Sequence, residues 1–233
     1  MDSYCIKPEY VARTNARTKV ENIEDYWTEQ RIRLSGQYQW DVYRLAAQHL
    51  TQHPGASVAD VGCGYPRKAQ QLLAPQADRL TLFDQPSMAP LMAAQFPQFD
   101  FVPVDLEAGL GEYDRQFDCV VCADVIEHLI DPTALVNVLK ALLAPSGYLF
   151  ISTPERDAAH GKQCTASKHP EHVREWNLEE FQNYLRRCGL QVRQQQQLPF
   201  KRLNPLLAAC APVLAGLNPA RFRSCQLVVC QLQ

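Results

Sequence analysis

Short apolar runs alternate with segments of helical periodicity along most of the chain. Apolar residues recur every three or four positions in 67–74, 87–96 and 131–143, a spacing typical of helices that cover a core. Around these segments, five short apolar runs predict strands, at 57–62, 79–84, 99–106, 117–125 and 147–153. This alternation predicts βαβ units and therefore a mostly parallel sheet with helices on its faces.

The pattern changes after the fifth predicted strand. Residues 175–190 predict a helix that starts at an Asn177 N-cap, carries Glu180 at its third position and ends at Gly189. Two further strands are predicted at 190–200 and 224–233. The segment between them does not have the spacing of a complete βαβ unit. The sequence therefore predicts an α/β fold with a seven-stranded, mostly parallel sheet that ends in an antiparallel pair.

Three stretches lie outside this alternation. Residues 1–20 are polar and aperiodic, which predicts an arm that is either flexible or draped over the surface. Residues 21–50 predict two cap helices separated by Gly36. The segment 203–217 is apolar and interrupted by prolines, and a lid, a dimer surface and ordinary packing all fit it.

The length of the chain bears on its domain organisation, and its net charge bears on the partners that it can bind. A chain of 233 residues buries enough surface to fold without disulfides or metals. We therefore expect one domain over residues 1–233, with the arm and cap helices in 1–50 and the core in 57–233. The formal net charge of −2 argues against a nucleic-acid backbone as partner. The oligomeric state stays open.

The cysteines and the apolar segments bear on the compartment. Cys119 and Cys122 lie in an apolar run with no second ligand pair at zinc-site spacing, which predicts buried free thiols rather than a metal or redox site. Free thiols suit a reducing compartment, so we expect the cytoplasm. The N-terminal stretch lacks the apolar core of a signal peptide, and the segment 206–217 is too short to span a bilayer, so no membrane insertion is expected.

A glycine turn follows the first predicted strand, in the run "DVGCGYP". Gly62 and Gly64 allow the backbone to approach a ligand, at the edge of the sheet where such folds bind ligands. A dinucleotide site requires a third glycine, but position 67 is Arg67, and no phosphate-binding Walker pattern is present. Asp60 enters the turn and would repel an anion but attract an amine or a cation.

Four successive strands end at or near an aspartate, at Asp60, Asp84, Asp105 and Asp124. Because the carboxyl ends of parallel strands meet at one rim, these carboxylates are expected to lie close together. Asp84 suits two hydrogen bonds from a ribose diol, and Asp105 suits an exocyclic amine of adenine. The set predicts one ligand that carries an amine, a diol and a positive charge.

The joint motifs resemble those of the class I S-adenosylmethionine-dependent methyltransferases. The likeness covers about residues 40–233 and is carried by "VADVGCG", "LFD", "VDLE", "FDCVVCADVIEHL" and "LLAPSGYLFISTP". It implies a doubly wound, Rossmann-like fold and S-adenosylmethionine as the cofactor. The segments "STPERD" and "HPEHVREWNLEEF" are also similar to bacterial methyltransferases of sugar and polysaccharide pathways, which implies a sugar or glycan hydroxyl as acceptor.

The resemblance also implies roles for single residues. Asp60, Gly62 and Gly64 would line the methionine portion of the cofactor, Asp84 its ribose and Asp105 its adenine. The implied cofactor site is completed by four further residues, Cys63, Gln85, Leu106 and Asp124. Members of the family often carry a third glycine where this chain has Pro66, so the contact made by that part of the loop stays open.

The run "ADVIEHL" holds candidates for the chemistry. If a helix begins near Asp124, then Asp124, Glu127 and His128 lie on one helical face beside the crevice. Three roles are open: His128 as the general base for a hydroxyl, the trio as a divalent-metal site, or capping and packing.

Two further polar stretches flank the predicted crevice. The long connection 155–176 carries His172 and Arg174, which suit an acceptor's hydroxyls or acidic groups; a plain solvated loop is the alternative. Arg67 and Lys68 add two positive charges, and we expect both to be solvated on a helix surface.

We therefore predict a methyltransferase that acts on a hydroxyl of a small molecule, with a sugar or glycan intermediate preferred. An N-methyltransferase and a quinone-type O-methyltransferase are the alternatives. A nucleic-acid methyltransferase and a nicotinamide oxidoreductase rank lower, since the chain lacks both a [DNS]-P-P-[YFW] motif after the fourth strand and a third glycine. A silent binding module is the remaining rival. The catalytic candidates are His128, His172 and Glu127, and a metal requirement stays open.

Overall fold

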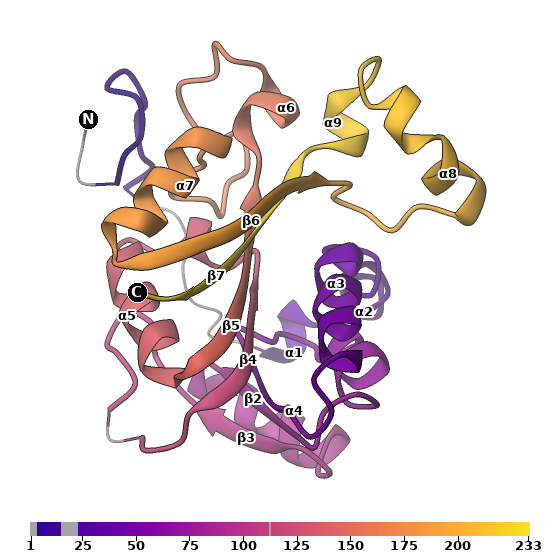
Figure 1. Cartoon of the computed structure of the whole chain (residues 1–233), viewed down its shortest axis with the longest axis vertical. Coiled ribbons are helices and arrows are strands. Elements are labelled where there is room, and N and C mark those ends of the chain that lie inside the picture. The colour runs from indigo at the N-terminus through magenta and orange to yellow at the C-terminus, as the bar shows by residue number, and fades with distance from the viewer. Residues whose placement is uncertain (1–3, 15–22, 112) are drawn as a thin grey trace.

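A computed structural model describes residues 4–14, 23–111 and 113–233. Seven strands form one sheet in the order β3-β2-β1-β4-β5-β7-β6 (Figure 1). The strands are β1 (Ser57–Val61), β2 (Arg79–Asp84), β3 (Asp100–Pro103), β4 (Phe117–Ala123), β5 (Leu143–Pro154), β6 (Leu190–Leu198) and β7 (Cys225–Leu232). The strand count and the α/β class are as predicted.

Both the parallel part of the sheet and its antiparallel end are confirmed. The strands β1 to β5 pair in parallel with their neighbours. In contrast, β7 runs antiparallel to both β5 and β6 and lies between them. β3 is shorter than the predicted strand 99–106, so Asp105 lies in the turn beyond it, where it forms an isolated bridge with Gly109.

The helices are mostly short. Gly36 caps α2 (Glu29–Ser35) and separates it from α3 (Trp40–Thr51), as predicted. The first of the two predicted cap helices is broken into α1 (Ile23–Tyr26) and α2. The predicted helix 67–74 forms a π-helical turn, η1 (Ala69–Leu73). The other helices of the described residues are α1 (Ile23–Tyr26), α2 (Glu29–Ser35), α3 (Trp40–Thr51), α4 (Ala89–Gln95), α5 (Pro132–Leu142), α6 (Arg156–His160), α7 (Leu178–Arg187), α8 (Pro205–Leu214) and α9 (Pro219–Phe222), with short 3₁₀ turns at η2 (Pro86–Met88) and η3 (Ile126–His128).

The sheet has a hydrophobic core on each face. Side chains alternate between faces along a strand, so Val120 and Cys122 of β4 enter one core while Cys119 and Val121 enter the other. The helices α5 and α7 cover the first face, and α3, η1 and α4 cover the second. The two cysteines of the C-x2-C run are free and buried, as predicted, and they point to opposite faces.

The described part of the N-terminal arm packs onto the body of the protein. Cys5 and Ile6 are buried in the core under α7. The backbone N–H of Lys7 donates to Glu180 at 3.0 Å, and the Trp176 indole donates to the carbonyl of Tyr4 at 2.9 Å. The draped alternative therefore holds for residues 4–14, whereas residues 1–3 and 15–20 of the predicted arm lie outside the described residues.

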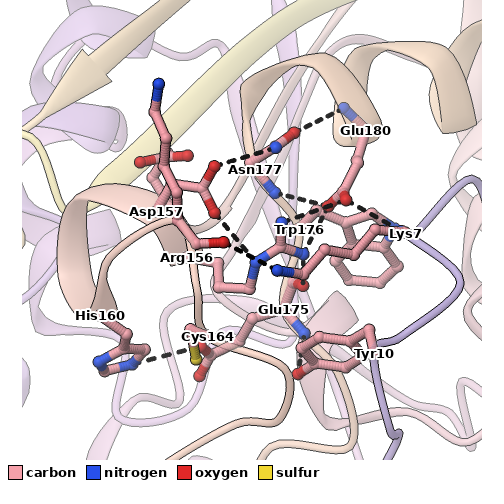
Figure 2. Close-up of polar contacts among 12 residues, drawn as sticks. Lys7, Tyr10, Arg156, Asp157, His160, Cys164, Glu175, Trp176, Asn177 and Glu180 are labelled. Carbon is pink, nitrogen blue, oxygen red and sulfur yellow. Dashed lines mark hydrogen bonds and ion pairs between the residues drawn. The ribbon is translucent and has the colours of Figure 1, made fainter.

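The connection 155–176 is a plain solvated loop only in its middle, and that alternative is wrong for its two ends. Residues 155–156 and 172–176 are buried, whereas most of 161–170 is exposed. Arg156 is 1% exposed and donates to both carboxylate oxygens of Glu180, at 2.6 and 3.1 Å. It also donates to Asp157 at 3.1 Å, and the Asn177 amide reaches the same carboxylate. Figure 2 shows Arg156 between these two acidic groups, with Lys7 of the arm beside them. This network joins the arm, α6 and α7.

The apolar segment 203–217 forms α8, which begins at an Asn204 N-cap and contains Pro212. None of the residues of α8 is buried, so ordinary core packing does not describe the helix. Across the part of the chain that the structure describes, we find no helix with the length and apolar character needed to cross a membrane.

Candidate functional site

A cavity of about 870 Å³ opens at the carboxyl ends of the parallel strands. Its floor comes from the segments that follow β1, β2, β3 and β4, and its opposite wall from α1, α2 and the residues before α3. The cavity brings together eight of the nine predicted cofactor residues: Gly62, Cys63, Gly64, Asp84, Gln85, Asp105, Leu106 and Asp124. Among the catalytic candidates, His128 also lines it.

The glycine turn is required by the conformation and packing of the protein itself. Gly62 and Gly64 have φ values of 71° and 54°, which side-chain-bearing residues rarely adopt. A Cβ at Gly62 would collide with Val125, and one at Gly64 would approach the Trp27 ring at 3.1 Å. The two glycines therefore let Val125 and Trp27 close over the turn.

Asp84 joins the end of β2 to this turn. One of its carboxylate oxygens accepts from the backbone N–H of Gly64 and the other from that of Gln85, both at 2.7 Å. Burial raises the pKa of this carboxyl, and the two N–H groups act in the opposite direction. Each carboxylate oxygen has a second lone pair, so the group retains capacity to accept further hydrogen bonds from a ligand in the cavity.

Asp124 does not begin a helix, so the expected helical face of Asp124, Glu127 and His128 is wrong. Asp124 has a φ of 52°, and α5 begins only after its N-cap Asp131. The unusual conformation is held by two distant groups, because Ser152 donates to one carboxylate oxygen at 2.6 Å and Gln39 to the other at 2.9 Å. Burial raises the pKa of the Asp124 carboxyl.

Asp60 lies behind the cavity rather than on its surface. It is fully buried and accepts from the Tyr43 hydroxyl at 3.0 Å. Burial raises its pKa to about 7 and lowers the pKa of the nearby Lys68 to about 8. Lys68 itself lines the cavity and donates to the carbonyl of Ser35 at 2.7 Å. The expectation of a solvated Lys68 is therefore wrong, whereas Arg67 is exposed as expected.

His128 has one ring nitrogen to which none of the described residues makes a close hydrogen bond. Its Nδ1 lies 2.9 Å from the carbonyl oxygen of Glu171, so Nδ1 carries the proton and Nε2 bears the lone pair. Its Nε2 lies 4.0 Å from Glu127 Oε1, too far for a hydrogen bond. Burial, together with the neighbouring His172, lowers the pKa of His128 to about 4, so the ring is neutral at pH 7.

Glu127 and His172 lie beside His128 but outside the cavity lining. Glu127 is fully buried. One of its oxygens accepts from Thr153 at 3.0 Å, and the other, Oε1, has no hydrogen-bond partner among the described residues. His172 Nδ1 bonds the Glu175 carboxylate at 2.6 Å. One ligand atom from each of Glu127, His128 and His172 lies within 4.8 Å of the others, a grouping compatible with a metal ion.

Arg174, the other polar candidate of the long connection, is buried. Its guanidinium donates to the carbonyl oxygens of Leu129 and Ile130, at 2.9 and 2.8 Å. These bonds place Arg174 under the segment that follows His128, where it supports the shape of the cavity floor.

The sequence prediction missed the wall that the N-terminal helices contribute. The side chains of this wall that line the cavity are Asp25, Tyr26, Trp27, Arg31, Ser35, Tyr38, Gln39 and Tyr43. Their aromatic and polar pattern marks a helix that is not fully solvated, but the pattern alone does not tell which side of the sheet the helix meets.

A family model described as a methyltransferase domain matches residues 28–195, well over half of the chain. The match includes the glycine turn, the four strand-end aspartates and His128. The comparison therefore assigns the same segments that surround the cavity to the methyltransferase domain.

Curated relatives share the same region of the chain. The ubiquinone biosynthesis O-methyltransferase of Albidiferax ferrireducens is 32% identical over 114 residues, 46% of this chain and 45% of that protein. The protein of the same description from Marinobacter nauticus is 28% identical over 158 residues, 60% of this chain and 66% of that protein. The chain thus spans about half to two thirds of the length of these relatives.

A solved structure extends the likeness to the whole fold. The 1,6-didemethyltoxoflavin-N1-methyltransferase of Burkholderia thailandensis, solved with 1,6-didemethyltoxoflavin and S-adenosylhomocysteine, superposes with a TM-score of 0.55 at 19% identity. The superposition covers 94% of this chain and 93% of that one. Taken with the sheet order and the family match, these findings place the chain in the class I S-adenosylmethionine-dependent methyltransferases.

Proposed function

We propose that the protein transfers a methyl group from S-adenosylmethionine to a hydroxyl group of a small molecule, with His128 as the general base. The observation that carries this proposal is the Nε2 atom of His128, which bears a lone pair on a residue that lines the cavity. A hydroxyl acceptor must lose a proton as the new bond forms, and a neutral imidazole accepts it. We favour oxygen over nitrogen as the acceptor atom because the curated relatives are named O-methyltransferases.

The cofactor fits the cavity through the strand-end groups. Bound S-adenosylmethionine supplies an electrophilic methyl group. We assign the ribose to Asp84, the adenine to Asp105 and Leu106, and the methionine portion to the glycine turn, with Asp124 and Gln85 as neighbours. Asp60 supports the site from behind through Tyr43 and Lys68. A cavity of about 870 Å³ is at the upper end of the range for small-molecule sites and has room for an acceptor beside the cofactor.

The acceptor class that we favour is a phenolic hydroxyl of a quinone-type molecule. Curated relatives are named for ubiquinone biosynthesis, and the aromatic side chains of Tyr26, Trp27 and Tyr38 line the cavity. Aromatic side chains pack well against flat aromatic ligands. A sugar hydroxyl, which the sequence likeness favours, ranks second.

A divalent cation at Glu127, His128 and His172 is the second candidate for activating the hydroxyl. The observation that favours it is Glu127 Oε1, a buried oxygen that accepts no hydrogen bond from the part of the chain that the structure describes and lies beside two imidazoles. Mixed carboxylate and imidazole donors suit a transition metal. Dialysis against a chelator separates the two roles: lost turnover that returns with added metal supports the cation, and unchanged turnover supports His128 acting alone.

Calorimetric titration tests the cofactor assignment first. We expect S-adenosylmethionine and S-adenosylhomocysteine to bind the native chain and NADH not to bind. Asp84→Ala should weaken both adenosyl ligands by roughly tenfold or more, because it removes a charged acceptor for the ribose diol. Unchanged affinity in Asp84→Ala would remove Asp84 from the cofactor site.

A pair of histidine variants tests the base. In a screen with catechol-type and sugar-type acceptors, His128→Gln should lower kcat by about 10²–10⁴, the usual contribution of a positioned base. Its affinity for S-adenosylhomocysteine should stay unchanged. The matched control is His169→Gln, which alters the same imidazole cluster at a residue that does not line the cavity, and it should retain most of the turnover. Equal losses in both variants would contradict the assignment of the base.

A further inference from the structure

The segment between β6 and β7, residues 201–223, presents an apolar helix to solvent. We call it the β6–β7 insertion. Its main element, α8, contains no charged residue and no buried residue. Leu206 is 76% exposed, Val213 79% and Leu217 83%, the highest exposures among the large apolar side chains of the described chain. In Figure 1, α8 and α9 project beyond the edge of the sheet.

An exposed apolar helix such as α8 is expected to pack against another apolar surface. A helix that is hydrophobic on all sides is normally buried in a core or in lipid. Large apolar surfaces that are exposed to solvent usually mark an interaction site. The helix is nevertheless specified locally, since the Asn204 side chain caps it by accepting from the N–H of Leu207 at 2.8 Å and Pro205 stands at its first position.

The charges on either side of α8 indicate which kind of surface it contacts. The insertion carries four cationic side chains and no acidic one, at Lys201, Arg202, Arg221 and Arg223. All four are exposed, and they occupy the two ends of the insertion, on either side of α8. The chain as a whole has a net charge of −2, so this local excess of positive charge stands out. An apolar helix flanked only by cations matches a surface with anionic head groups over an apolar layer.

We propose that the β6–β7 insertion docks peripherally on an anionic lipid bilayer, with the apolar side chains of α8 at the head-group boundary. A second copy of this chain fits the same surface less well. A symmetric contact through α8 would bring two sets of four cations together without acidic partners from the insertion, and like charges repel.

The insertion is tied to the cavity wall at its base. Lys201 pairs as an isolated bridge with Tyr38, and the N–H of Gln39 donates to the carbonyl of Phe200 at 3.2 Å. Tyr38 and Gln39 both line the cavity. Docking would therefore hold one wall of the cavity close to the lipid. The docking itself does not depend on the proposed function, because it needs neither cofactor nor acceptor.

Vesicle sedimentation with the full chain tests the proposal. The probes are vesicles of phosphatidylcholine alone and vesicles with about a third of phosphatidylglycerol. We expect binding to the anionic vesicles, weaker binding to the neutral ones, and a loss of binding as salt rises. Replacing Lys201 and Arg223 by Gln should weaken binding roughly 25-fold, at about fivefold for each cation near the surface.

The apolar part of the contact needs its own variant and a matched control. The triple variant L206E/V213E/L217E should abolish vesicle binding but keep the affinity for S-adenosylhomocysteine, which shows that the fold is intact. Val11→Glu, at an apolar residue that is 68% exposed on the arm, should bind vesicles like the native chain. Equal binding of the native and triple-variant chains would overturn the proposal. So would a native dimer in sedimentation velocity that the triple variant dissociates, without vesicle binding by the native chain.

Discussion

At the residue scale, the pair of Tyr43 and Asp60 shows how the site depends on groups behind its surface. The Asp60 carboxyl is fully buried, and its hydrogen bond comes from a neutral phenol rather than from a cation. Burial therefore dominates and raises its pKa to about 7. The unfolded chain would ionise this group near pH 4.

This difference predicts a pH-dependent stability. Between about pH 4 and 7 the folded chain holds a proton on Asp60 that the unfolded chain has lost, so the free energy of unfolding falls as the pH rises through that range. One such group contributes a slope of up to about 1.4 kcal/mol per pH unit. In urea titrations at pH 5 and pH 7, Asp60→Asn should show a smaller loss of stability than the native chain. Identical losses would contradict the buried, protonated carboxyl.

The sequence predicts the position of a single residue where that position depends on its neighbours in the sequence. Asp84 and Asp124 each follow a buried apolar run, so their place at the rim of the sheet could be predicted. Lys68 could not, because its burial arises where the turn η1 packs against α3 and α2. The left-handed backbone of Asp124 likewise depends on Ser152 and Gln39, which are distant in sequence.

At the element scale, α7 is the helix that its own sequence specifies best. The Asn177 side chain accepts from the N–H of Glu180, and the Glu180 carboxylate accepts from the N–H of Asn177, both at 3.0 Å. This reciprocal cap and the glycine at the far end are short-range signals, and the predicted limits of the helix agree closely with the structure. In contrast, the polar connection before α7 gave no local sign that residues 172–176 would be buried.

The cap makes a measurable contribution to stability. Asn177→Ala removes a hydrogen-bond acceptor from the first turn of α7 and should lower the free energy of unfolding by about 0.5–2 kcal/mol. Asn177→Ser keeps an acceptor in the same place and should recover most of this loss. Urea unfolding followed by tryptophan fluorescence measures both. A serine variant no more stable than the alanine variant would assign the loss to the bond between Asn177 and Asp157 instead.

At the scale of the whole molecule, the network around Arg156 joins the N-terminal arm to α6 and α7, more than 140 residues further along the chain. The Glu180 carboxylate accepts from Arg156, from the N–H of Lys7 on the arm and from its own helix cap (Figure 2). The Arg156 side chain also lies 5.4 Å from the centre of the Tyr10 ring. The arm, α6 and α7 therefore share one buried pair of opposite charges.

Removing only the cation of this pair should lower the free energy of unfolding. Arg156→Met leaves the Glu180 carboxylate buried without its cation and should lower the free energy of unfolding by about 3–5 kcal/mol. The double variant R156M/E180Q removes both charges, keeps the cap and should recover at least half of that loss. Arg193→Met is the control at an exposed arginine and should cost about 0.5 kcal/mol or less. If the double variant is less stable than Arg156→Met, charge burial is not the cause.

The place of β7 in the sheet has a consequence for how the protein is made. Ribosomes deliver β6 before β7, yet β7 lies between β6 and β5, so β6 has no neighbouring strand when it leaves the exit tunnel. Until residues 225–232 follow, β5 and β6 both present open strand edges, which recruit other chains. The interval of synthesis between β6 and β7, which includes the β6–β7 insertion, is therefore a period in which the nascent chain is exposed to aggregation and a chaperone would protect it.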